Sequence, residues 1–181
     1  MSESRLPQTS KAQKTAAPSG CHTDILIRPL GEEAEARFCA EFLVASEPWV
    51  TLGLGFDRAL ARLTDPTREV NAALIQNAVA GVLILHLSGP LNGYIQLLAV
   101  HPDWRGRGVG TRLIRWAEER IFQQSPNVFL CVSDFNHRAR EWYERLGYRP
   151  IGGLPDFVVN GRSEILMRKT RGPWFTFKPT V

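Results

Sequence analysis

The chain has 181 residues, of which 44% are hydrophobic and 22% charged, which is enough for one domain whose hydrophobic core needs no disulfide or structural metal. Its 22 Lys and Arg residues exceed its 18 Asp and Glu residues by only four, so the composition excludes a polybasic protein and gives little support to nucleic acid as a partner. Cys21, Cys39 and Cys131 lack CxxC and Cys/His spacings, so no disulfide framework or metal site is predicted.

The N-terminal segment differs in composition from the rest of the chain. Residues 1–22 are rich in Ser, Thr, Lys, Pro and Ala and nearly free of large apolar side chains, so they are predicted to form a disordered leader, with the folded domain over 23–181. No apolar run reaches the roughly 18 to 20 residues that cross a bilayer, and the N-terminus lacks the hydrophobic core of a signal peptide. We therefore expect a cytoplasmic protein without a membrane partner.

Hydrophobic periodicity predicts a mixed order of helices and strands. In chain order the sequence predicts a strand over 24–30, helices over 32–46 and 56–63, strands over 69–76, 79–87 and 94–100, a helix over 108–124, a strand over 127–133, a helix over 137–146, and strands over 157–159 and 163–169. The turn residues Asn77-Ala78 and Asn160-Gly161 predict hairpins between neighbouring strands. The three consecutive strands between residues 69 and 100 are expected to be antiparallel.

A glycine-rich loop precedes the third predicted helix. Residues 105–110 read RGRGVG, between an apolar strand and an amphipathic helix. Glycine lets the backbone approach a ligand closely, and the unpaired amides and the dipole at a helix N-terminus attract anions. Arg105 and Arg107 add charge that suits phosphate oxygens. The loop therefore predicts a diphosphate site.

Two nucleotide-binding motifs are excluded for this loop. A dinucleotide fingerprint requires GxGxxG, but Thr111 stands where the third glycine belongs, and residues 126–130 hold no acidic partner for a ribose. A P-loop requires Gly-Lys-Ser/Thr, which does not occur in the sequence. A glycine-rich turn that merely joins a strand to a helix is the plain alternative.

The string LLAVHPDWRGRGVGTRLI resembles the acetyl-coenzyme A signature of the GNAT family of N-acetyltransferases, R/Q-x-x-G-x-G/A, with Arg105, Gly108 and Gly110 in its fixed places. A second string, LCVSDFNHRAREWYERLGY, resembles the strand and helix that follow in this family. Its matches to the pattern L-x-V-x-x-x-N-x-x-A-x-x-x-Y-x-x-x-G-F/Y are Leu130, Val132, Asn136, Ala139, Tyr143, Gly147 and Tyr148. Together with the order of elements, the resemblance covers residues 24–170.

The resemblance implies an α/β (α+β) fold, in which helices flank a mixed central sheet whose central strands, here residues 97–100 and 128–132, splay apart. The gap between these strands would admit the pantetheine arm of acetyl-CoA, the implied co-substrate. The residues that the resemblance assigns to acetyl-CoA are Leu98, Ala99, Val100, Arg105, Gly106, Arg107, Gly108, Val109, Gly110, Thr111 and Asn136. Main-chain groups of Leu98 and Val100 would pair with the pantetheine amides, as an added strand does.

Tyr143 is the candidate general acid. Transfer of acetyl from a thioester to an amine needs protonation of the leaving thiolate, and a phenol with a pKa of about 10 can donate to a thiolate whose parent thiol has a pKa of about 8.5. Asn136 and Tyr143 are seven residues apart, so one helix face presents an amide to the pantetheine and a phenol to the sulfur. Packing against Trp142 is the alternative role for this ring.

The general base is where this sequence departs from the family pattern. Family members often carry a glutamate early in the central strand, but residues 92–96 read Asn-Gly-Tyr-Ile-Gln. Water-relayed deprotonation by Glu47, His86 or Asp156 is one route, with Glu47 preferred by topology, and the other is direct reaction of the small neutral fraction of the amine without a protein base. A solvated loop position is the plain alternative for Glu47. Cys131 lies in an apolar strand without an evident His partner, so no covalent acyl-enzyme is expected.

Aromatic side chains are candidates for the wall of an acceptor pocket, because the loop after the first helix and the last hairpin flank that pocket in this family. They are Trp49, Phe56, Tyr94 and Phe157, and core packing also explains each of them. Pro48-Trp49 resembles the Pro-Trp in the same loop of N-terminal peptide acetyltransferases such as the ribosomal-protein alanine enzyme. The basic, aromatic segment 169–179 fits a solvated end strand or a homodimer contact better than nucleic acid.

Taken together, these residues predict an acetyl-CoA-dependent N-acetyltransferase that acts by direct attack in a ternary complex. The acceptor is either a primary amine of a small molecule or a peptide N-terminus. The alternative function is a non-catalytic acyl-CoA-binding or sensing module, which the missing glutamate supports and Tyr143 opposes.

Overall fold

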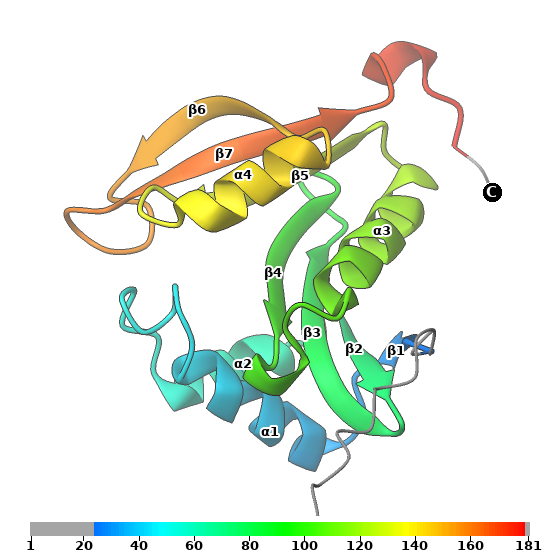
Figure 1. Ribbon diagram of the computed structural model, residues 1–181. Coiled ribbons are helices and arrows are strands. Elements are labelled where there is room, and N and C mark those ends of the chain that lie inside the picture. Colours follow the sequence, from blue (N-terminus) through cyan, green and yellow to red (C-terminus); the bar gives the residue numbers. More distant parts are fainter. Residues whose placement is uncertain (1–23, 180–181) are drawn as a thin grey trace, which may run out of the picture.

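Seven strands, four α-helices and two short 3₁₀ turns make up residues 24–179, the part of the chain that the computed structural model describes (Figure 1). The predicted leader, residues 1–22, lies outside the described residues. In chain order the elements are β1 (Leu26–Pro29), α1 (Glu33–Val44), α2 (Phe56–Leu63), β2 (Glu69–Ile75), β3 (Ala78–His86), β4 (Tyr94–Val100), η1 (Pro102–Trp104), α3 (Val109–Phe122), β5 (Asn127–Ser133), α4 (His137–Arg145), β6 (Arg149–Pro155), β7 (Ser163–Thr170) and η2 (Trp174–Thr176). The predicted elements are confirmed, with small shifts at their ends, except for one strand near the C-terminus.

All seven strands form one sheet in the order β1-β2-β3-β4-β5-β7-β6. Every neighbouring pair is antiparallel except β4 and β5, which are parallel. These two central strands share only two residue pairs, Tyr94 with Phe129 and Ile95 with Leu130, and then diverge (Figure 1). The predicted mixed sheet with splayed central strands is therefore confirmed.

A β-bulge in β4 accompanies this divergence. Leu85 of β3 lies opposite Ile95, and the preceding β3 residue, Ile84, lies opposite Leu97. Gln96 is therefore the extra residue of the bulge, without a partner in β3. A bulge bends its strand and increases the local twist. The bend falls where the pairing of β4 with β5 stops, so β4 continues along β3 while β5 continues along β7.

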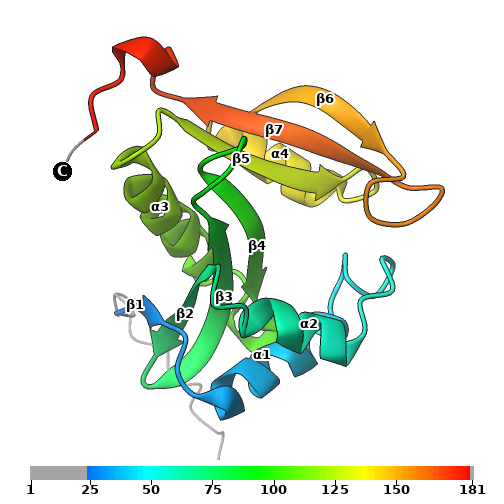
Figure 2. The same cartoon turned by 180° about the vertical axis from the view of Figure 1, so that it is seen from behind.

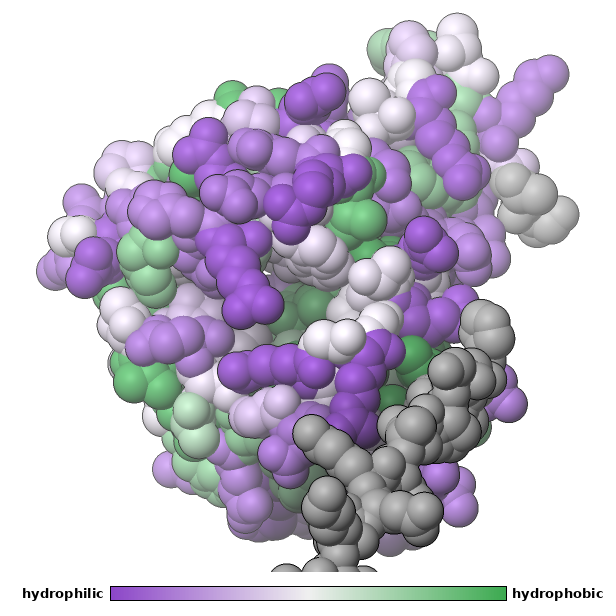
Figure 3. All heavy atoms as spheres, in the orientation of Figure 1, coloured by the Kyte–Doolittle hydropathy of each residue, from purple (hydrophilic) through white to green (hydrophobic). Residues whose placement is uncertain are grey.

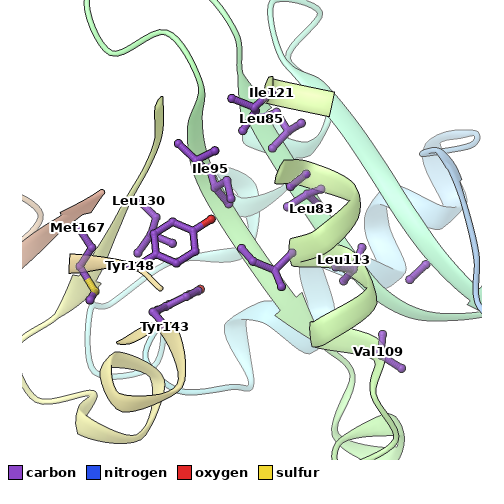
Figure 4. Packing of buried hydrophobic residues seen from close by; sticks show 14 of the residues in the cluster. Leu83, Leu85, Ile95, Val109, Leu113, Ile121, Leu130, Tyr143, Tyr148 and Met167 are labelled. Atoms are coloured by element: carbon purple, nitrogen blue, oxygen red, sulfur yellow. The ribbon is translucent and has the colours of Figure 1, made fainter. Parts of the chain in front are cut away.

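Helices cover both faces of the sheet, α3 and α4 on one face and α1 and α2 on the other (Figures 1 and 2). Alternate residues of β3 point to opposite faces. Leu83 and Leu85 join the cluster that contains α3, whereas Val82 and Ile84 join the cluster that contains α1. Figure 4 shows side chains of α3 directed at Leu83 and Leu85. Both faces of β3 are buried, which explains its uninterrupted apolar sequence.

The turn between β2 and β3 lies one residue earlier than predicted. Ile75 pairs with Ala78, so Gln76 and Asn77 form the two-residue loop, and both have positive φ, 49° and 66°. Positive φ at both central residues is typical of a type I′ turn, whose twist matches that of the flanking strands. The predicted hairpin is confirmed, with Gln76-Asn77 instead of Asn77-Ala78 at the turn.

The predicted strand over 157–159 is wrong. The strand that pairs with β7 is β6, and it precedes this segment and forms the edge of the sheet. Residues 156–162 form a loop closed by Asp156, whose backbone N–H donates to the Arg162 carbonyl at 2.9 Å and whose Oδ1 accepts from the Gly161 N–H at 2.6 Å. The sequence of β6 contains two prolines and two glycines, residues with low strand propensity, so this strand was not predicted. An edge strand tolerates proline because its outer side needs no hydrogen bonds to another strand.

The C-terminal segment leaves the sheet after Thr170, where β7 ends, so of the two alternatives for residues 169–179 the end strand is wrong beyond that residue, and the homodimer contact stays a prediction. Trp174–Thr176 form a 3₁₀ turn, and the Phe175 side chain is fully exposed.

Within residues 24–179, none of the helices has the length and apolar content needed to cross a membrane.

Gly93→Ala is expected to destabilise the fold by about 3 kcal/mol, from backbone strain together with overpacking. Gly93 has φ +93°, and a Cβ atom there would stand 2.5 Å from the Asn127 carbonyl oxygen and 2.6 Å from Ile121 Cγ2. Gly89→Ala is the matched control, because its φ is +85° but nothing lies within 4 Å of the added carbon. Urea denaturation should give a loss of about 1 kcal/mol for the control, from strain alone. Equal losses in the two variants would contradict the packing argument.

Candidate functional site

A cavity of about 1050 Å³ opens where β4 and β5 diverge. Its walls come from both central strands, the loop between α1 and α2, α2 itself, the first turn of α3, α4, and the loop between β6 and β7. The space-filling view shows a hollow between the two halves of the molecule, with apolar residues at its bottom and hydrophilic residues around its rim (Figure 3). The gap in the sheet is therefore a ligand-sized site.

The edge of β4 presents unpaired backbone groups to this cavity. The His101 N–H donates to the Ala80 carbonyl of β3 at 2.9 Å. Because backbone groups alternate in direction along a strand, the N–H and C=O groups of Leu98 and Val100 face the open side. The Ala99 carbonyl instead faces β3, where it would lie 2.7 Å from a Cβ atom on Gly81. Of the three predicted β4 residues, Leu98 and Val100 are thus placed to pair with a ligand.

The glycine loop forms a cradle at the N-terminus of α3. Gly106 and Gly108 have φ of +76° and +83°, and a Cβ atom at either would meet nothing within 4 Å. The first backbone hydrogen bond of the helix runs from the Arg112 N–H to the Gly108 carbonyl at 2.9 Å, and no side chain caps the helix. The N–H groups of residues 109–111 therefore lack intrahelical acceptors and, with the helix dipole, form an anion site.

The two loop arginines differ in position. Arg105 lines the cavity, and its guanidinium donates to Ser46 Oγ at 3.1 Å and to the Val100 carbonyl at 3.3 Å. Both acceptors are neutral, so its charge is not cancelled. Arg107 lies outside the cavity wall and stacks 5.0 Å from the centre of the Trp104 ring. Arg107 was predicted among the cofactor residues, but it does not line the cavity.

Tyr143 lines the cavity from α4 and is only 9% exposed. Its ring centre lies 4.8 Å from that of Trp142 and 5.7 Å from that of Tyr148, and Figure 4 shows the two tyrosines side by side. Burial raises the pKa of the Tyr143 phenol above its ordinary value, so the hydroxyl keeps its proton and is available as a donor.

Asn136 also lies on the cavity wall, at the N-cap of α4. Its Oδ1 accepts from the Ala139 N–H at 3.2 Å, a helix cap of the usual kind. The side-chain oxygen is therefore occupied by the cap. The NH₂ group of Asn136 is the part of this side chain that is left to donate to a ligand.

Of the residues considered as bases or pocket walls, only some reach the cavity. Glu47 lies at its rim with an exposed side chain whose Oε2 accepts from the Thr51 N–H at 3.3 Å. His86 and Asp156 do not line the cavity, so the structure does not support either of them as the base. The aromatic residues Trp49, Tyr94 and Phe157 line the cavity, whereas Phe56 does not and packs against the cluster around α1.

Sequence reasoning missed Glu164, a carboxylate that lines the cavity and is 6% exposed. It lies in β7 directly opposite Ser133 of β5, whose Oγ donates to Glu164 Oε1 at 2.6 Å. Burial raises the pKa of the Glu164 carboxyl most, the hydrogen bond from Ser133 opposes the rise, and the charge of Asp134 adds to it. The available signal was a glutamate directly before the apolar run Ile165-Leu166-Met167 of a predicted strand, because glutamate beside core positions is rarely buried unless it is paired.

Cys131 lies in β5, and its side chain is half-buried. Burial raises the pKa of its thiol. A raised pKa keeps sulfur in the unreactive thiol form, which agrees with the expectation that no covalent acyl-enzyme forms. Within the described part of the chain, no group of three or more His, Cys, Asp or Glu side chains is arranged to hold a metal ion.

Comparisons with known proteins match this chain to acetyltransferases. A family model described as the acetyltransferase (GNAT) family matches residues 34–148. The aminoalkylphosphonate N-acetyltransferase of Salmonella typhimurium is 33% identical over 51% of this chain and 64% of that protein, and the N-alpha-acetyltransferase RimI of Mycobacterium tuberculosis is 28% identical over 77% of this chain and 89% of that protein. A crystal structure of an aminoglycoside 6'-N-acetyltransferase complexed with coenzyme A has a TM-score of 0.65 at 20% identity, over 82% of this chain and 98% of that one.

The chain spans less than two thirds of the length of the first curated relatives that it matches, between 39% and 64% of each.

Glu164→Gln is expected to stabilise the fold at high pH. Because the folded-state pKa of Glu164 is raised, the folded chain binds more protons than the unfolded chain between the two pKa values, so stability falls as the pH rises through that window. Glutamine stays neutral and still accepts from Ser133, so the stability gap between variant and wild type should be absent below the ordinary pKa of about 4.3, widen as the pH rises to the folded-state pKa, and stay constant above it.

Urea denaturation between acidic and alkaline pH measures this gap. The exposed Glu41 of α1 forms none of the ion pairs found within residues 24–179, so Glu41→Gln is the matched control. A stability difference for Glu164→Gln that does not change with pH would contradict the raised pKa.

Proposed function

The chain belongs to the acetyltransferase (GNAT) family, whose model matches residues 34–148, and from this premise we propose that it transfers acetyl from acetyl-CoA to a primary amine. The amine belongs to a small molecule or to a peptide N-terminus, and it attacks directly in a ternary complex. The observation that carries the proposal is the open edge of β4 beside the anion cradle of α3. These two features suit the two chemically distinct parts of coenzyme A, an amide-containing arm and a diphosphate.

The open edge of β4 suits the pantetheine arm. This arm contains two amides, and the N–H and C=O groups of Leu98 and Val100 offer the hydrogen bonds of an added strand. One of these groups, the Val100 carbonyl, already accepts from Arg105 at 3.3 Å. The NH₂ group of Asn136 lies on the facing wall and can donate to an amide carbonyl.

The cradle at the N-terminus of α3 suits the pyrophosphate. The free N–H groups of residues 109–111 supply donors, and the open space above Gly106 and Gly108 lets the phosphate oxygens approach the backbone. Arg105 adds a positive charge whose partners in the structure are neutral. The site therefore has donors, charge and room for a diphosphate without any change in backbone.

Tyr143 is the proposed general acid. The neutral amine nitrogen forms a C–N bond at the thioester carbonyl carbon, and the C–S bond then breaks. The Tyr143 hydroxyl proton moves to the leaving sulfur, and the phenolate recovers, through water, the proton that the new amide nitrogen loses. The products are the acetylated amine and the free thiol of CoA, and no covalent bond to the protein forms.

The nature of the acceptor amine is the open part of this proposal. Among the similar proteins, one is named for an aminoalkylphosphonate and another is named an N-alpha-acetyltransferase. A steady-state assay of free CoA release with a panel of small amines and N-terminal peptides tests the proposal. Turnover with at least one acceptor supports it. Tight acetyl-CoA binding without turnover by any acceptor would instead favour a non-catalytic acyl-CoA-binding or sensing module.

Gly108→Val is expected to weaken acetyl-CoA binding by about tenfold or more, since one lost charge-assisted hydrogen bond is worth roughly 1.5 to 3 kcal/mol. The valine strains a backbone with φ +83° and fills the open space of the cradle. Gly89→Val is the matched control, because it carries the same kind of strain at φ +85° in a loop outside the cavity. Calorimetry should show a normal affinity for the control. Equal affinity in Gly108→Val and wild type would reject this placement of the pyrophosphate.

Tyr143→Phe is expected to lower turnover by about 10²-fold, the low end of general acid catalysis, while acetyl-CoA affinity is retained. The phenylalanine keeps the ring that packs against Trp142 and removes only the hydroxyl. Tyr148→Phe is the matched control, since Tyr148 is buried in the same aromatic cluster but does not line the cavity. The rate of free CoA release measures turnover. An equal loss of turnover in both variants would indicate that the effect comes from packing and not from proton donation.

A further inference from the structure

The cavity carries separated charges on the sheet face that α1 and α2 cover. Val132 and Ile165 pack in the cluster around α3, so their neighbours in β5 and β7, which include Cys131 and Glu164, point to the opposite face. Ile95 of β4 packs in the same cluster around α3, so its neighbour Tyr94 points to the opposite face as well. All three line the cavity, so this face forms the part of the cavity away from the cradle of α3.

Two arginines of α2 line the same part of the cavity. Arg58 and Arg62 are four residues apart and therefore share a helix face. Among residues 24–179, neither belongs to any of the ion pairs found. Burial lowers the pKa of Arg62 most, and the charge of Arg58 lowers it further. Two neighbouring cations without a protein counterion, one of them partly buried, are a site for an anion.

Tyr94 lines the cavity together with Glu164 and Arg62. Burial raises the pKa of Tyr94 most, Cys131 and Glu164 raise it further, and Arg62 lowers it. Within residues 24–179 no ion pair joins Glu164 to an arginine, so the carboxylate and the guanidinium groups do not neutralise each other. The walls of one cavity therefore carry an anionic group, a phenol and a cationic pair.

We propose that the acceptor is a small amine that also carries an acidic group, with its ammonium held at Glu164 and its carboxylate, sulfonate or phosphonate held at Arg58 and Arg62. This inference rests on the proposed acetyltransferase activity and assigns its substrate class. A bifunctional acceptor pairs with both charged ends at once, whereas a diamine meets two cations at α2 and a plain alkylamine leaves them without a counterion. Like charges brought together in a poorly hydrated site repel strongly.

Glu164 also supplies the base that β4 lacks. Its Oε1 is held by Ser133 at 2.6 Å, and within residues 24–179 no hydrogen bond to Oε2 is found, so that oxygen is available to the ammonium. A proton moves from the ammonium nitrogen to Oε2, which leaves a neutral amine with its lone pair free to form the C–N bond, and the carboxylic acid later releases the proton to water. A raised carboxyl pKa brings the base closer to neutral pH and improves this transfer.

Matched acceptors test the substrate class. The probes are β-alanine, taurine and 2-aminoethylphosphonate, compared with propylamine and 1,3-diaminopropane, and the readout is kcat/KM from CoA release at saturating acetyl-CoA. The acid-bearing amines are expected to exceed propylamine by about tenfold or more, the effect of one good charge-assisted contact. Equal values, or a preference for the diamine, would overturn the inference while leaving the acetyltransferase activity in place. Absence of turnover with every amine and peptide would overturn the proposed function itself.

A peptide pair distinguishes the source of the acidic group. The tetrapeptides Ser-Glu-Ala-Ala and Ser-Ala-Ala-Ala present the same N-terminal amine with and without a nearby carboxylate. If the acidic peptide exceeds both the neutral peptide and the small acids, the acceptor is a protein N-terminus, and the small-molecule assignment is overturned. If the small acids exceed both peptides, the assignment is supported.

Charge-removing variants test the arginines. Arg58→Gln and Arg62→Gln should each lower the preference for β-alanine over propylamine by about tenfold, mainly through KM, because the lost contact is made equally in ground and transition state. Arg115→Gln is the matched control, since Arg115 is exposed on α3 outside the cavity and forms no ion pair among the described residues. A preference that survives both α2 variants, or that falls equally in the control, would overturn the anion site.

The pH profile tests Glu164. The charged and titratable groups around it are Tyr94, Cys131 and Asp134, with the α2 arginines beyond Tyr94, so the profile is compared between single variants. Glu164→Gln keeps the acceptor for Ser133 and should lower kcat by about 10²-fold and change the acidic limb of kcat/KM, with acetyl-CoA affinity unchanged. An acidic limb that is identical in wild type and Glu164→Gln, or one that Glu47→Gln alone removes, would overturn the role of Glu164.

Discussion

The divergence of β4 from β5 is the constraint on which the rest of this structure depends. Two parallel strands normally satisfy each other's backbone groups along their whole length, and an unpaired buried backbone group is costly. Here the pairing stops after Ile95 and Leu130, at the bulge of Gln96. The seven-residue ladder between β5 and β7 draws β5 away, and the packing of α3 against β3, β4 and β5 holds the two halves together. The β5–β7 ladder and the packing of α3 thus stabilise a sheet in which the edge of β4 stays unpaired.

The gap connects two chemically different faces of one sheet. On the α3 and α4 face lie the anion cradle and the buried phenol of Tyr143. On the α1 and α2 face lie Glu164 and the arginines of α2. A thioester threaded through the gap would meet a proton donor from one side and an amine from the other. Under the proposed function, this arrangement would bring donor and acceptor together, as a direct transfer requires.

Burial decides which groups on these walls are reactive. It raises the pKa of Tyr143, Cys131 and Glu164 alike, because a low-dielectric wall disfavours every anion. The same effect has three consequences: the phenol keeps a proton to give, the thiol stays unreactive, and the carboxylate becomes a stronger base. Under the proposed function, these shifts favour proton transfer over attack by a protein nucleophile.

Local sequence by itself determined the features that one contiguous segment builds. The cradle of residues 106–111 follows from glycine positions and a helix start, and the alternation of the strands follows from apolar periodicity, so both were predicted. β6 was missed because Pro150 and Gly152 oppose a strand locally, and only pairing with β7 overrides that preference. The presence of Glu164 and the arginines of α2 on the walls of one cavity was decided by tertiary structure alone, because β7 and α2 are distant in sequence and line the same cavity only in the folded chain. No spacing in the chain encodes that arrangement, which depends on the sheet order and the bulge.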